Sequence, residues 1–217
     1  MIEGLFIVIE GIDGAGTTTQ ARLLHEALRA RGLPVHTTRE PSDGPVGMLL
    51  RQFLTNRVVV PGMHGSHPPS WRTMALLFAA DRQDHLEAEV LPNLMEGVSV
   101  ISDRYDYSSV AYQSAGNDEP EVAEWVQKLN QFARRPDLAI VIDVDPEVAS
   151  NRRRERSSVV DLYEEDELQA KLAEVYRNLP GLFPNDRIVI VDGNGPQEAV
   201  AAAVMREVRI LRNEPVD

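Results

Sequence analysis

The stretch Leu5–Thr19, which reads LFIVIEGIDGAGTTT, decides the fold of this chain. Its first part, Leu5–Glu10, is a run of apolar and largely β-branched residues, which predicts a buried strand. Gly11–Gly16 follows as a glycine-rich turn, and Thr18–Arg31 carries leucines and alanines on one face, as an amphipathic helix does. A strand, a glycine-rich turn and a helix in this order predict the opening unit of an α/β domain with a parallel sheet.

The rest of the chain continues this alternation of strands and helices. Further short apolar runs predict strands at Val35–Thr38, Val98–Ser102, Leu138–Asp143 and Arg187–Asp192. Helical patterns lie between and after them, at Pro45–Asn56, Trp71–Met95 with a break near Pro92, Asp106–Gly116, Glu121–Arg134, Pro146–Arg156, Asp161–Asn178 and Gln197–Arg212. We therefore expect a three-layer α/β fold, with five parallel strands in one sheet and helices on both faces.

The length of 217 residues favours one domain, so we expect a single domain over residues 1–217. Within it, Arg57–Pro69 carries three prolines and two glycines, which predicts a loop or insertion. His64 and His67 lie in this segment without an apparent third ligand, so we expect surface histidines rather than a metal site.

The composition excludes several classes of protein. The absence of cysteine excludes disulfides, Cys-type zinc sites, Fe–S clusters and a catalytic thiol. Neither a membrane span nor a secretory signal is apparent, so we expect a cytoplasmic protein without a membrane partner. The net charge of −12 argues against a nucleic-acid partner, although a local arginine cluster can still bind a small anion. Of the 22 basic residues only Lys128 and Lys171 are lysines.

The glycine-rich turn matches most of the phosphate-loop pattern G-x-x-x-x-G-K-[ST]. In that pattern backbone N–H groups surround phosphates, the lysine reaches the β and γ oxygens, and the hydroxyl holds Mg²⁺. Here Gly11, Gly16 and Thr18 stand at the required positions, whereas Thr17 replaces the lysine. The alternative is an ordinary glycine-rich turn, but the strand before it and the helix after it favour a phosphate loop.

Charged residues end the predicted strands, where ligands bind in open α/β sheets. Asp103 and Arg104 follow the third strand, where a carboxylate suits Mg²⁺ and a guanidinium can bind a phosphate through two hydrogen bonds. The alternative is a structural ion pair. Arg39 follows the second strand, and by itself it indicates no more than a surface cation.

Two further patterns lie on predicted helices. Phe78 and Arg82 are four residues apart and share one helix face, so together they can stack on a planar base and bond its carbonyls. A core phenylalanine beside a solvated arginine fits the same pair. Arg152–Arg156, between two predicted helices, holds four arginines in five positions, which fits cations that close over a nucleotide or a solvated basic turn.

Taken together, these motifs resemble the thymidylate kinase family over nearly the whole chain. The matching stretches, in order, are EGIDGAG-TTQ, TREP, LLFAADR, DRYDYSSVAYQ, and IDVDPEVA followed by the arginine-rich turn. The resemblance implies a phosphate-loop NTPase fold of the nucleoside-monophosphate-kinase type. It also implies transfer of the γ-phosphoryl group of ATP to thymidylate (dTMP), with Mg²⁺, in a homodimer.

The resemblance also implies roles for residues. Substrate would contact Asp13, Arg39, Phe78, Arg82, Arg104, Tyr107, Ser108, Tyr112 and Gln113. ATP would contact Gly11, Asp13, Gly14, Ala15, Gly16, Thr17, Thr18, Thr19 and Arg152. Thr18 and Asp103 would hold Mg²⁺. The catalytic residues would be Asp13, Arg104, Arg153 and Arg156, with a lid at about residues 151–160.

Thr17 departs from the family pattern, because it is neutral and short where a lysine is expected. One interpretation is that Arg153 or Arg156 of the lid supplies the missing cation and the protein is an active kinase. A second is a nucleotide-binding relative with weak catalysis, and a third is an altered residue in an ordinary enzyme. TREPGG of the family also reads TREPSDG here, which leaves another acceptor open.

Overall fold

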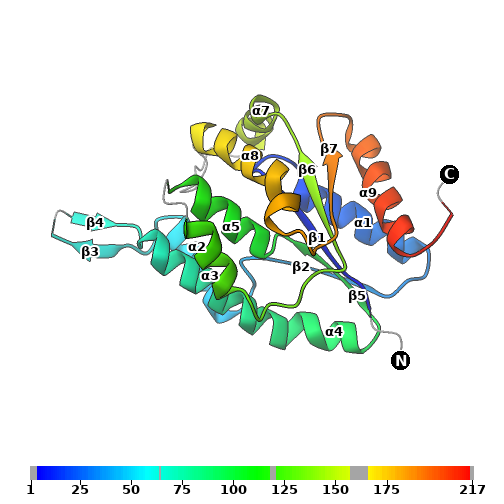
Figure 1. Cartoon of the computed structure of the whole chain (residues 1–217), viewed down its shortest axis with the longest axis horizontal. Coiled ribbons are helices and arrows are strands. Elements are labelled where there is room, and N and C mark those ends of the chain that lie inside the picture. The colour runs from blue at the N-terminus through cyan, green and yellow to red at the C-terminus, as the bar shows by residue number, and fades with distance from the viewer. Residues whose placement is uncertain (1–3, 64, 118–120, 157–165, 216–217) are drawn as a thin grey trace.

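The computed structural model describes residues 4–63, 65–117, 121–156 and 166–215. A sheet of five parallel strands forms its centre, in the order β2-β5-β1-β6-β7 (Figure 1). The bounds of these strands are β1 Phe6–Gly11, β2 Val35–Arg39, β5 Ser99–Asp103, β6 Leu138–Asp143 and β7 Ile188–Asp192. The predicted five-stranded parallel sheet is confirmed.

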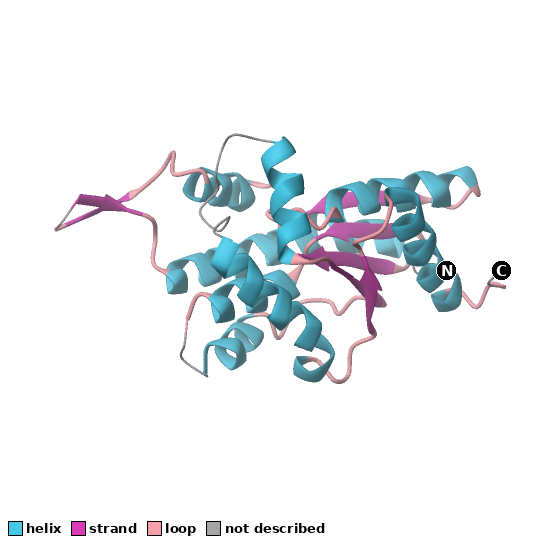
Figure 2. Cartoon of the chain, turned by 90° about the horizontal axis from the view of Figure 1, so that it is seen from above, coloured by secondary structure: helices cyan, strands magenta, loops and turns pink. Residues whose placement is uncertain are grey.

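Helices cover both faces of this sheet, so the three-layer prediction is also confirmed (Figures 1 and 2). Helices α1 and α9 pack together on one face, and α5 and α8 pack together on the other. The bounds of the helices are α1 Thr17–Ala30, α2 Pro45–Leu54, α3 Trp71–His85, α4 Leu91–Met95, α5 Asp106–Ala115, α6 Glu121–Leu129, α7 Pro146–Arg156, α8 Asp166–Leu182 and α9 Gln197–Leu211.

The burial of the central strands explains why their sequences are almost purely apolar. Every residue of β1 is buried, and so are the first five residues of β6. A strand covered by helices on both sides has no solvent face, and alternation of polar and apolar residues is therefore lost.

Several predicted elements differ from the structure, and helix α8 ends at Leu182, four residues beyond its predicted end at Asn178. The long helix is not broken at Pro92; a π-helical turn at Leu86–Val90 joins α3 to α4, and Pro92 follows in the first turn of α4, where no N–H is needed. Helix α6 ends at Leu129, five residues before the predicted end. The segment 57–69 contains an antiparallel hairpin, β3 Val60–Gly62 with β4 Gly65–His67, which projects from the body of the molecule (Figures 1 and 2).

The carboxyl ends of the strands meet at one edge of the sheet. Ile9 of β1 and Arg39 of β2 both lie opposite Asp103 of β5. The glycine-rich loop that follows β1 runs from this edge into α1. Residues far apart in sequence therefore converge at the place where the strand ends predict a ligand.

Candidate active site

A cavity of about 200 Å³ opens at this edge of the sheet. Most of the residues that were predicted to bind a substrate line this cavity. Its lining residues are Asp13, Glu40, Pro41, Leu54, Phe78, Arg82, Arg104, Tyr105, Ser108, Ser109, Tyr112 and Gln113.

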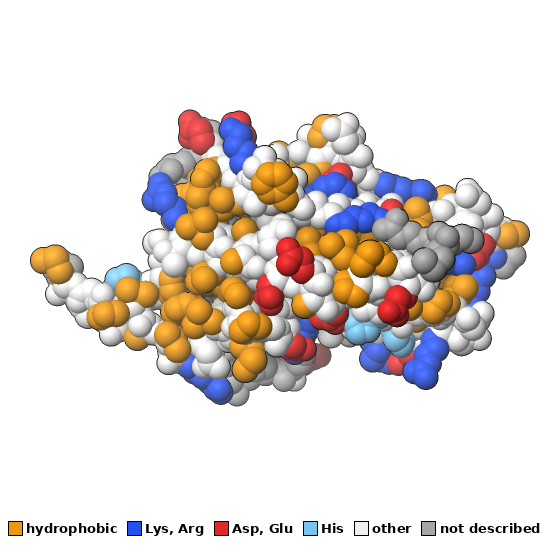
Figure 3. All heavy atoms as spheres, turned by 90° about the horizontal axis from the view of Figure 1, so that it is seen from below, with side chains coloured by type: hydrophobic (Ala, Val, Ile, Leu, Met, Phe, Trp, Pro, Cys, Tyr) orange, Lys and Arg blue, Asp and Glu red, His pale blue; other side chains and the backbone are white. Residues whose placement is uncertain are grey.

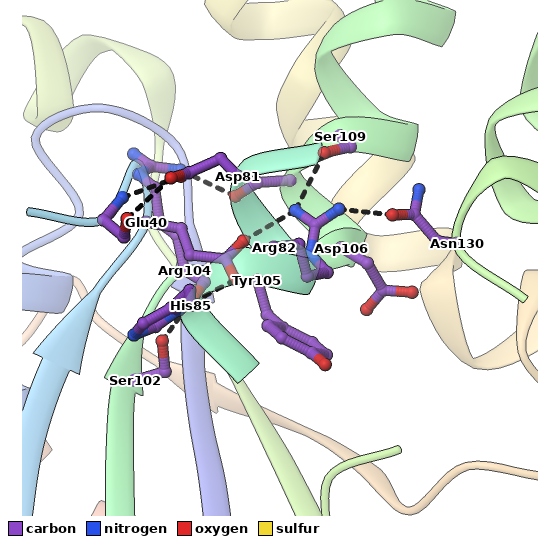
Figure 4. A network of polar contacts seen from close by, with 12 residues as sticks. Glu40, Asp81, Arg82, His85, Ser102, Arg104, Tyr105, Asp106, Ser109 and Asn130 are labelled. Atoms are coloured by element: carbon purple, nitrogen blue, oxygen red, sulfur yellow. Dashed lines mark hydrogen bonds and ion pairs between the residues drawn. The ribbon is translucent and has the colours of Figure 1, made fainter. Parts of the chain in front are cut away.

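One part of the cavity combines an aromatic wall with a buried guanidinium. Phe78 is half-buried in the wall, and Arg82, one helical turn further along α3, is only 1% exposed. Arg82 Nη2 donates to Glu40 Oε2 at 2.7 Å and to Ser109 Oγ at 3.1 Å (Figure 4). Its Nη1 donates to Asn130 Oδ1, whereas its Nε has no partner among the described residues. A planar base on Phe78 would therefore lie beside a cation whose position is fixed by Glu40, Ser109 and Asn130.

Glu40 is the carboxylate that balances this arginine. It lies just after β2, its side chain is 3% exposed, and its Oε1 lies 3.2 Å from His85 Nδ1. Burial opposes the charge of His85, but Glu40 and Glu89 outweigh it and raise the pKa of the imidazole above its ordinary value. The sequence indicated Glu40 only as a charged strand end and did not indicate Asn130 at all, because their common partner Arg82 lies 42 and 48 residues away.

The opposite part of the cavity holds Arg104 and Asp13. Arg104 follows β5 and has a left-handed backbone conformation, with φ of 74°. This conformation is strained for a residue other than glycine, and it persists where the contacts of the side chain hold the residue in place. Its Nη2 donates to Asp13 Oδ1 at 2.5 Å, and its Nη1 donates to the Gly11 carbonyl at 2.9 Å. The ring of Tyr112 lies 5.4 Å from the guanidinium carbon. This fixed cation suits an anionic group of a substrate.

Glu10, the last but one residue of β1, supports the residues at this end of the cavity. The sequence indicated it only as the end of a strand. It is fully buried, and its carboxylate accepts hydrogen bonds from the Tyr105 N–H at 2.8 Å and from Ser108 Oγ at 2.6 Å. Burial, partly offset by Arg104, raises the pKa of Glu10 to about 7. A charged residue inside an otherwise apolar strand was the available signal.

The glycine-rich loop lies beside this cavity and packs tightly on α7. A Cβ on Gly14 would lie 2.3 Å from the Ala149 carbonyl, and its φ of 91° also requires glycine. Gly16, with φ of 93°, precedes the first residue of α1, Thr17, which is 7% exposed. The loop therefore leads into a helix N-terminus, as an anion-binding loop does.

Thr18 and Asp103 are brought together, as predicted for a Mg²⁺ site. Thr18 Oγ1 donates to Asp103 Oδ2 at 2.5 Å, and Asp103 Oδ1 is buried without a hydrogen-bond partner in the described part of the chain. A hydroxyl and a carboxylate with an unused oxygen are ligands that suit Mg²⁺. Both residues also line a second cavity with Arg39, whose Nη2 donates to Asp43 Oδ1 at 2.9 Å. Arg39 thus lies beside the first cavity rather than in its lining.

A further cavity lies on the other side of the loop. Its lining includes Ala15, Gly16, Thr19, Arg152 and the loop between β7 and α9. Arg152 Nη2 donates to the Gly193 carbonyl at 3.1 Å. The predicted ATP-binding residues therefore surround space on both sides of the glycine-rich loop.

Two predictions need correction. Tyr107 does not line the cavity that holds Phe78, Arg82 and Arg104: it is fully buried, its hydroxyl donates to Asp186 Oδ2 at 2.8 Å, and its ring packs on Phe183. The arginine run is not a turn between helices, because Arg152–Arg156 forms the last part of α7, within the helix predicted over Pro146–Arg156. There Arg153 Nη1 donates to the Asp13 carbonyl at 2.6 Å. The side chain of Arg156 and residues 157–160 of the predicted lid lie outside the described residues.

Comparison with known proteins identifies the family. The family model described as thymidylate kinase matches residues 9–204. A probable thymidylate kinase of Pyrococcus horikoshii is 43% identical over 189 residues, which cover 87% of this chain and 88% of that protein. The thymidylate kinase of Ruegeria pomeroyi is 38% identical over 207 residues, covering 93% and 92%. The chain belongs to the thymidylate kinase family.

Membership of the thymidylate kinase family makes this chain a nucleoside monophosphate kinase by class, and it confirms the predicted fold. The names of the relatives support ATP-dependent phosphorylation of thymidylate, and none of them favours a weakly catalytic binding protein. Among the described residues, no helix has both the length and the apolar character that a membrane crossing requires.

Proposed function

We propose that this protein transfers the γ-phosphoryl group of ATP to the phosphate of thymidylate, giving thymidine diphosphate and ADP. The observation that carries the proposal is one cavity with Phe78 and Arg82 in one part and Arg104 with Asp13 in another. This cavity adjoins a glycine-rich loop at the N-terminus of α1. A planar base, a sugar and a phosphate fit such an arrangement in that order.

The acceptor nucleotide is assigned to this cavity. Its base stacks on Phe78, and the guanidinium of Arg82, which also lines the cavity, faces a carbonyl oxygen of the base. Ser108, Tyr112 and Gln113 line the space between. The phosphate lies towards Arg104, with Arg39 approaching from the adjacent cavity.

The donor nucleotide is assigned to the glycine-rich loop. Backbone N–H groups of Gly14 and of Gly16 to Thr19 bind the phosphates, because they stand at or just before the start of a helix, whereas the Ala15 N–H already donates to the Ile12 carbonyl. The cavity lined by Arg152 and Gly193 takes the adenosine part of ATP. Thr18 and Asp103 would hold Mg²⁺, which when bound would neutralise charge on the β- and γ-phosphates.

In the reaction, an oxygen of the acceptor phosphate forms a bond to the γ-phosphorus. The bond from that phosphorus to the β–γ bridging oxygen breaks, and ADP leaves with the electron pair. Both partners are anions, so catalysis consists of positioning and charge stabilisation. Thr17 brings no cation to the bridging oxygen, and we assign that task to Arg153, which already contacts the glycine-rich loop at the Asp13 carbonyl.

An ADP-release assay with ATP, Mg²⁺ and dTMP tests the proposal, run on the native chain and on Thr17→Lys. Turnover of the native chain at roughly 1–100 s⁻¹ supports an active kinase with a surrogate cation. Turnover of Thr17→Lys alone would support the weakly catalytic alternative. Absence of turnover in both proteins would contradict the proposal, and preference for uridylate or thymidine would change the acceptor.

We also propose that the protein works as a homodimer, as the family resemblance implies. Exposed apolar side chains on α2 and α3, Met48, Leu49 and Leu76, offer a face for a second copy. Figure 3 shows apolar side chains gathered on the part of the molecule beside the β3–β4 hairpin. Light scattering after size exclusion tests this: a mass near 24 kDa would contradict it, because 24.2 kDa is the mass of one chain.

A further inference from the structure

Asp13 is held at each of its four polar backbone and side-chain atoms. Its carbonyl accepts from Arg153 of α7, and its Oδ1 accepts from Arg104 after β5. The two remaining atoms, the backbone nitrogen and Oδ2, both form hydrogen bonds with one partner, Gln169 of α8. The Asp13 N–H donates to Gln169 Oε1 at 2.9 Å, and Gln169 Nε2 donates to Asp13 Oδ2 at 3.0 Å. Such complete attachment is unusual for a residue in the middle of a glycine-rich loop.

The geometry of Gln169 leaves it one orientation. Its residue is 0% exposed, and both ends of its amide face atoms of Asp13. Asp13 presents one donor and one carboxylate acceptor, so only an amide with its oxygen on the N–H and its nitrogen on the carboxylate satisfies both. Neither an ionised glutamate nor an apolar residue can make this pair of bonds.

Gln169 also connects parts of the site that are distant in sequence. It lies 156 residues from Asp13, in the first turn of α8. Helix α8 packs on β1 and β6, so the contact anchors the loop to the face of the sheet (Figure 1). Tyr176, further along α8, accepts a hydrogen bond from Arg104 at 3.1 Å. One helix therefore supports both members of the Asp13–Arg104 pair.

We propose that Gln169 is a positioning residue of the phosphotransfer site, whose amide fixes the Asp13 carboxylate and through it the Arg104 guanidinium and the glycine-rich loop. The proposal rests on the proposed function, since it assigns Gln169 to the same site. Asp13 lines the substrate cavity, whereas Gln169 is fully buried and bonds to Asp13. Gln169 therefore acts through Asp13 rather than on a substrate.

Two variants separate this role from a general packing role. Gln169→Leu removes both hydrogen bonds at similar volume. Gln169→Glu keeps an acceptor for the Asp13 N–H but places a second carboxylate near Asp13 Oδ2, about 3.0 Å away. When this pair holds a proton, its O–H replaces the lost N–H donor, and when it holds none, the two carboxylates repel each other. Gln131→Glu, on an exposed residue, controls for the added charge.

The experiment measures kcat and KM for dTMP and ATP from pH 5.5 to 8, relative to the native chain. We expect kcat/KM for dTMP to fall about 10–100-fold in Gln169→Leu at every pH, because displacement of a reacting group by about 1 Å costs up to ~10²-fold. In Gln169→Glu the loss should be similar at pH 8 and shrink as the pH falls. KM for ATP is measured in both variants as well, because the glycine-rich loop that Gln169 fixes through Asp13 is also assigned to the phosphates of ATP.

The native chain and all variants share the same charged and polar groups around this pair, so the ratio of kcat/KM to that of the native chain isolates the effect of residue 169. These groups are Arg104, Arg153, Tyr112, Tyr176 and Glu10. A Gln169→Leu protein with native kcat/KM, or a Gln169→Glu ratio that does not vary with pH, would overturn the proposal. A native chain without turnover would instead overturn the proposed function. In that case amide exchange at Asp13 decides about Gln169: faster exchange in Gln169→Leu supports it, and unchanged exchange refutes it.

Discussion

Glu40→Gln removes one charge from the buried Glu40–Arg82 pair in the lining of the proposed substrate cavity. The side chains of Arg82 and Glu40 are 1% and 3% exposed, and the two are joined by a hydrogen bond of 2.7 Å. Loss of one partner from a buried pair leaves the other charge without compensation and costs about 3–5 kcal/mol. Asn130 and Ser109 still accept hydrogen bonds from Arg82, and glutamine can accept one too, so we expect the lower end of that range.

The effect on melting follows from the size of the chain. For a protein of about 150–250 residues each kcal/mol shifts Tm by about 2–4 °C, so about 3 kcal/mol corresponds to a fall of roughly 6–12 °C. Glu26→Gln is the matched control, since its pair with Arg22 is 56% exposed on both sides and is worth about 0.3–0.5 kcal/mol.

Denaturant unfolding of the native chain and both variants measures these differences. If Glu40→Gln costs less than about 1 kcal/mol, or no more than Glu26→Gln, then Arg82 is compensated by groups other than Glu40 and the reasoning is wrong. The double variant Glu40→Gln with Arg82→Met adds a check. Removal of both charges should restore part of the stability that the single variant loses, because no buried charge is left unpaired.

Three further predictions concern the site. Phe78→Ala should weaken dTMP binding by about 1–3 kcal/mol in calorimetry, since the base loses its stacking partner; an unchanged affinity refutes that role. Arg153→Ala should lower kcat about 10²–10³-fold if this cation replaces the lysine, whereas Arg206→Ala on α9 should not; equal rates contradict the assignment. Glu10 has a pKa raised to about 7 by burial, so the folded state binds a proton that the unfolded state releases near pH 4.5. The free energy of unfolding should therefore fall by about 3 kcal/mol between pH 4.5 and 7, and more slowly above, and Glu10→Gln should flatten this slope in denaturant titrations. If Glu10→Gln leaves this pH dependence unchanged, a group other than Glu10 has the raised pKa.

Local sequence alone determined the sheet and the glycine-rich loop. Short runs of apolar or β-branched residues predicted all five strands of the sheet, and the signal was clearest for β1, β5 and β6, because a strand buried on both faces can hold almost nothing but apolar residues. The glycines of the loop were equally informative, since Gly14 and Gly16 take conformations that other residues rarely adopt. The phosphate-loop pattern and the family resemblance assigned Thr18 and Asp103 to one Mg²⁺ site, and the two side chains do meet in the structure.

The partners of the site residues were decided only by the tertiary structure. Tyr107 shows the limit: its place in the motif predicted the substrate cavity, but the turn of α5 directs its ring towards Phe183. Glu40 with Arg82, and Gln169 with Asp13, are separated by 42 and 156 residues. Sequence periodicity reports which face of an element is buried, whereas the choice of hydrogen-bond partner depends on distances across the packed layers, and those distances exist only once the helices have docked on the sheet.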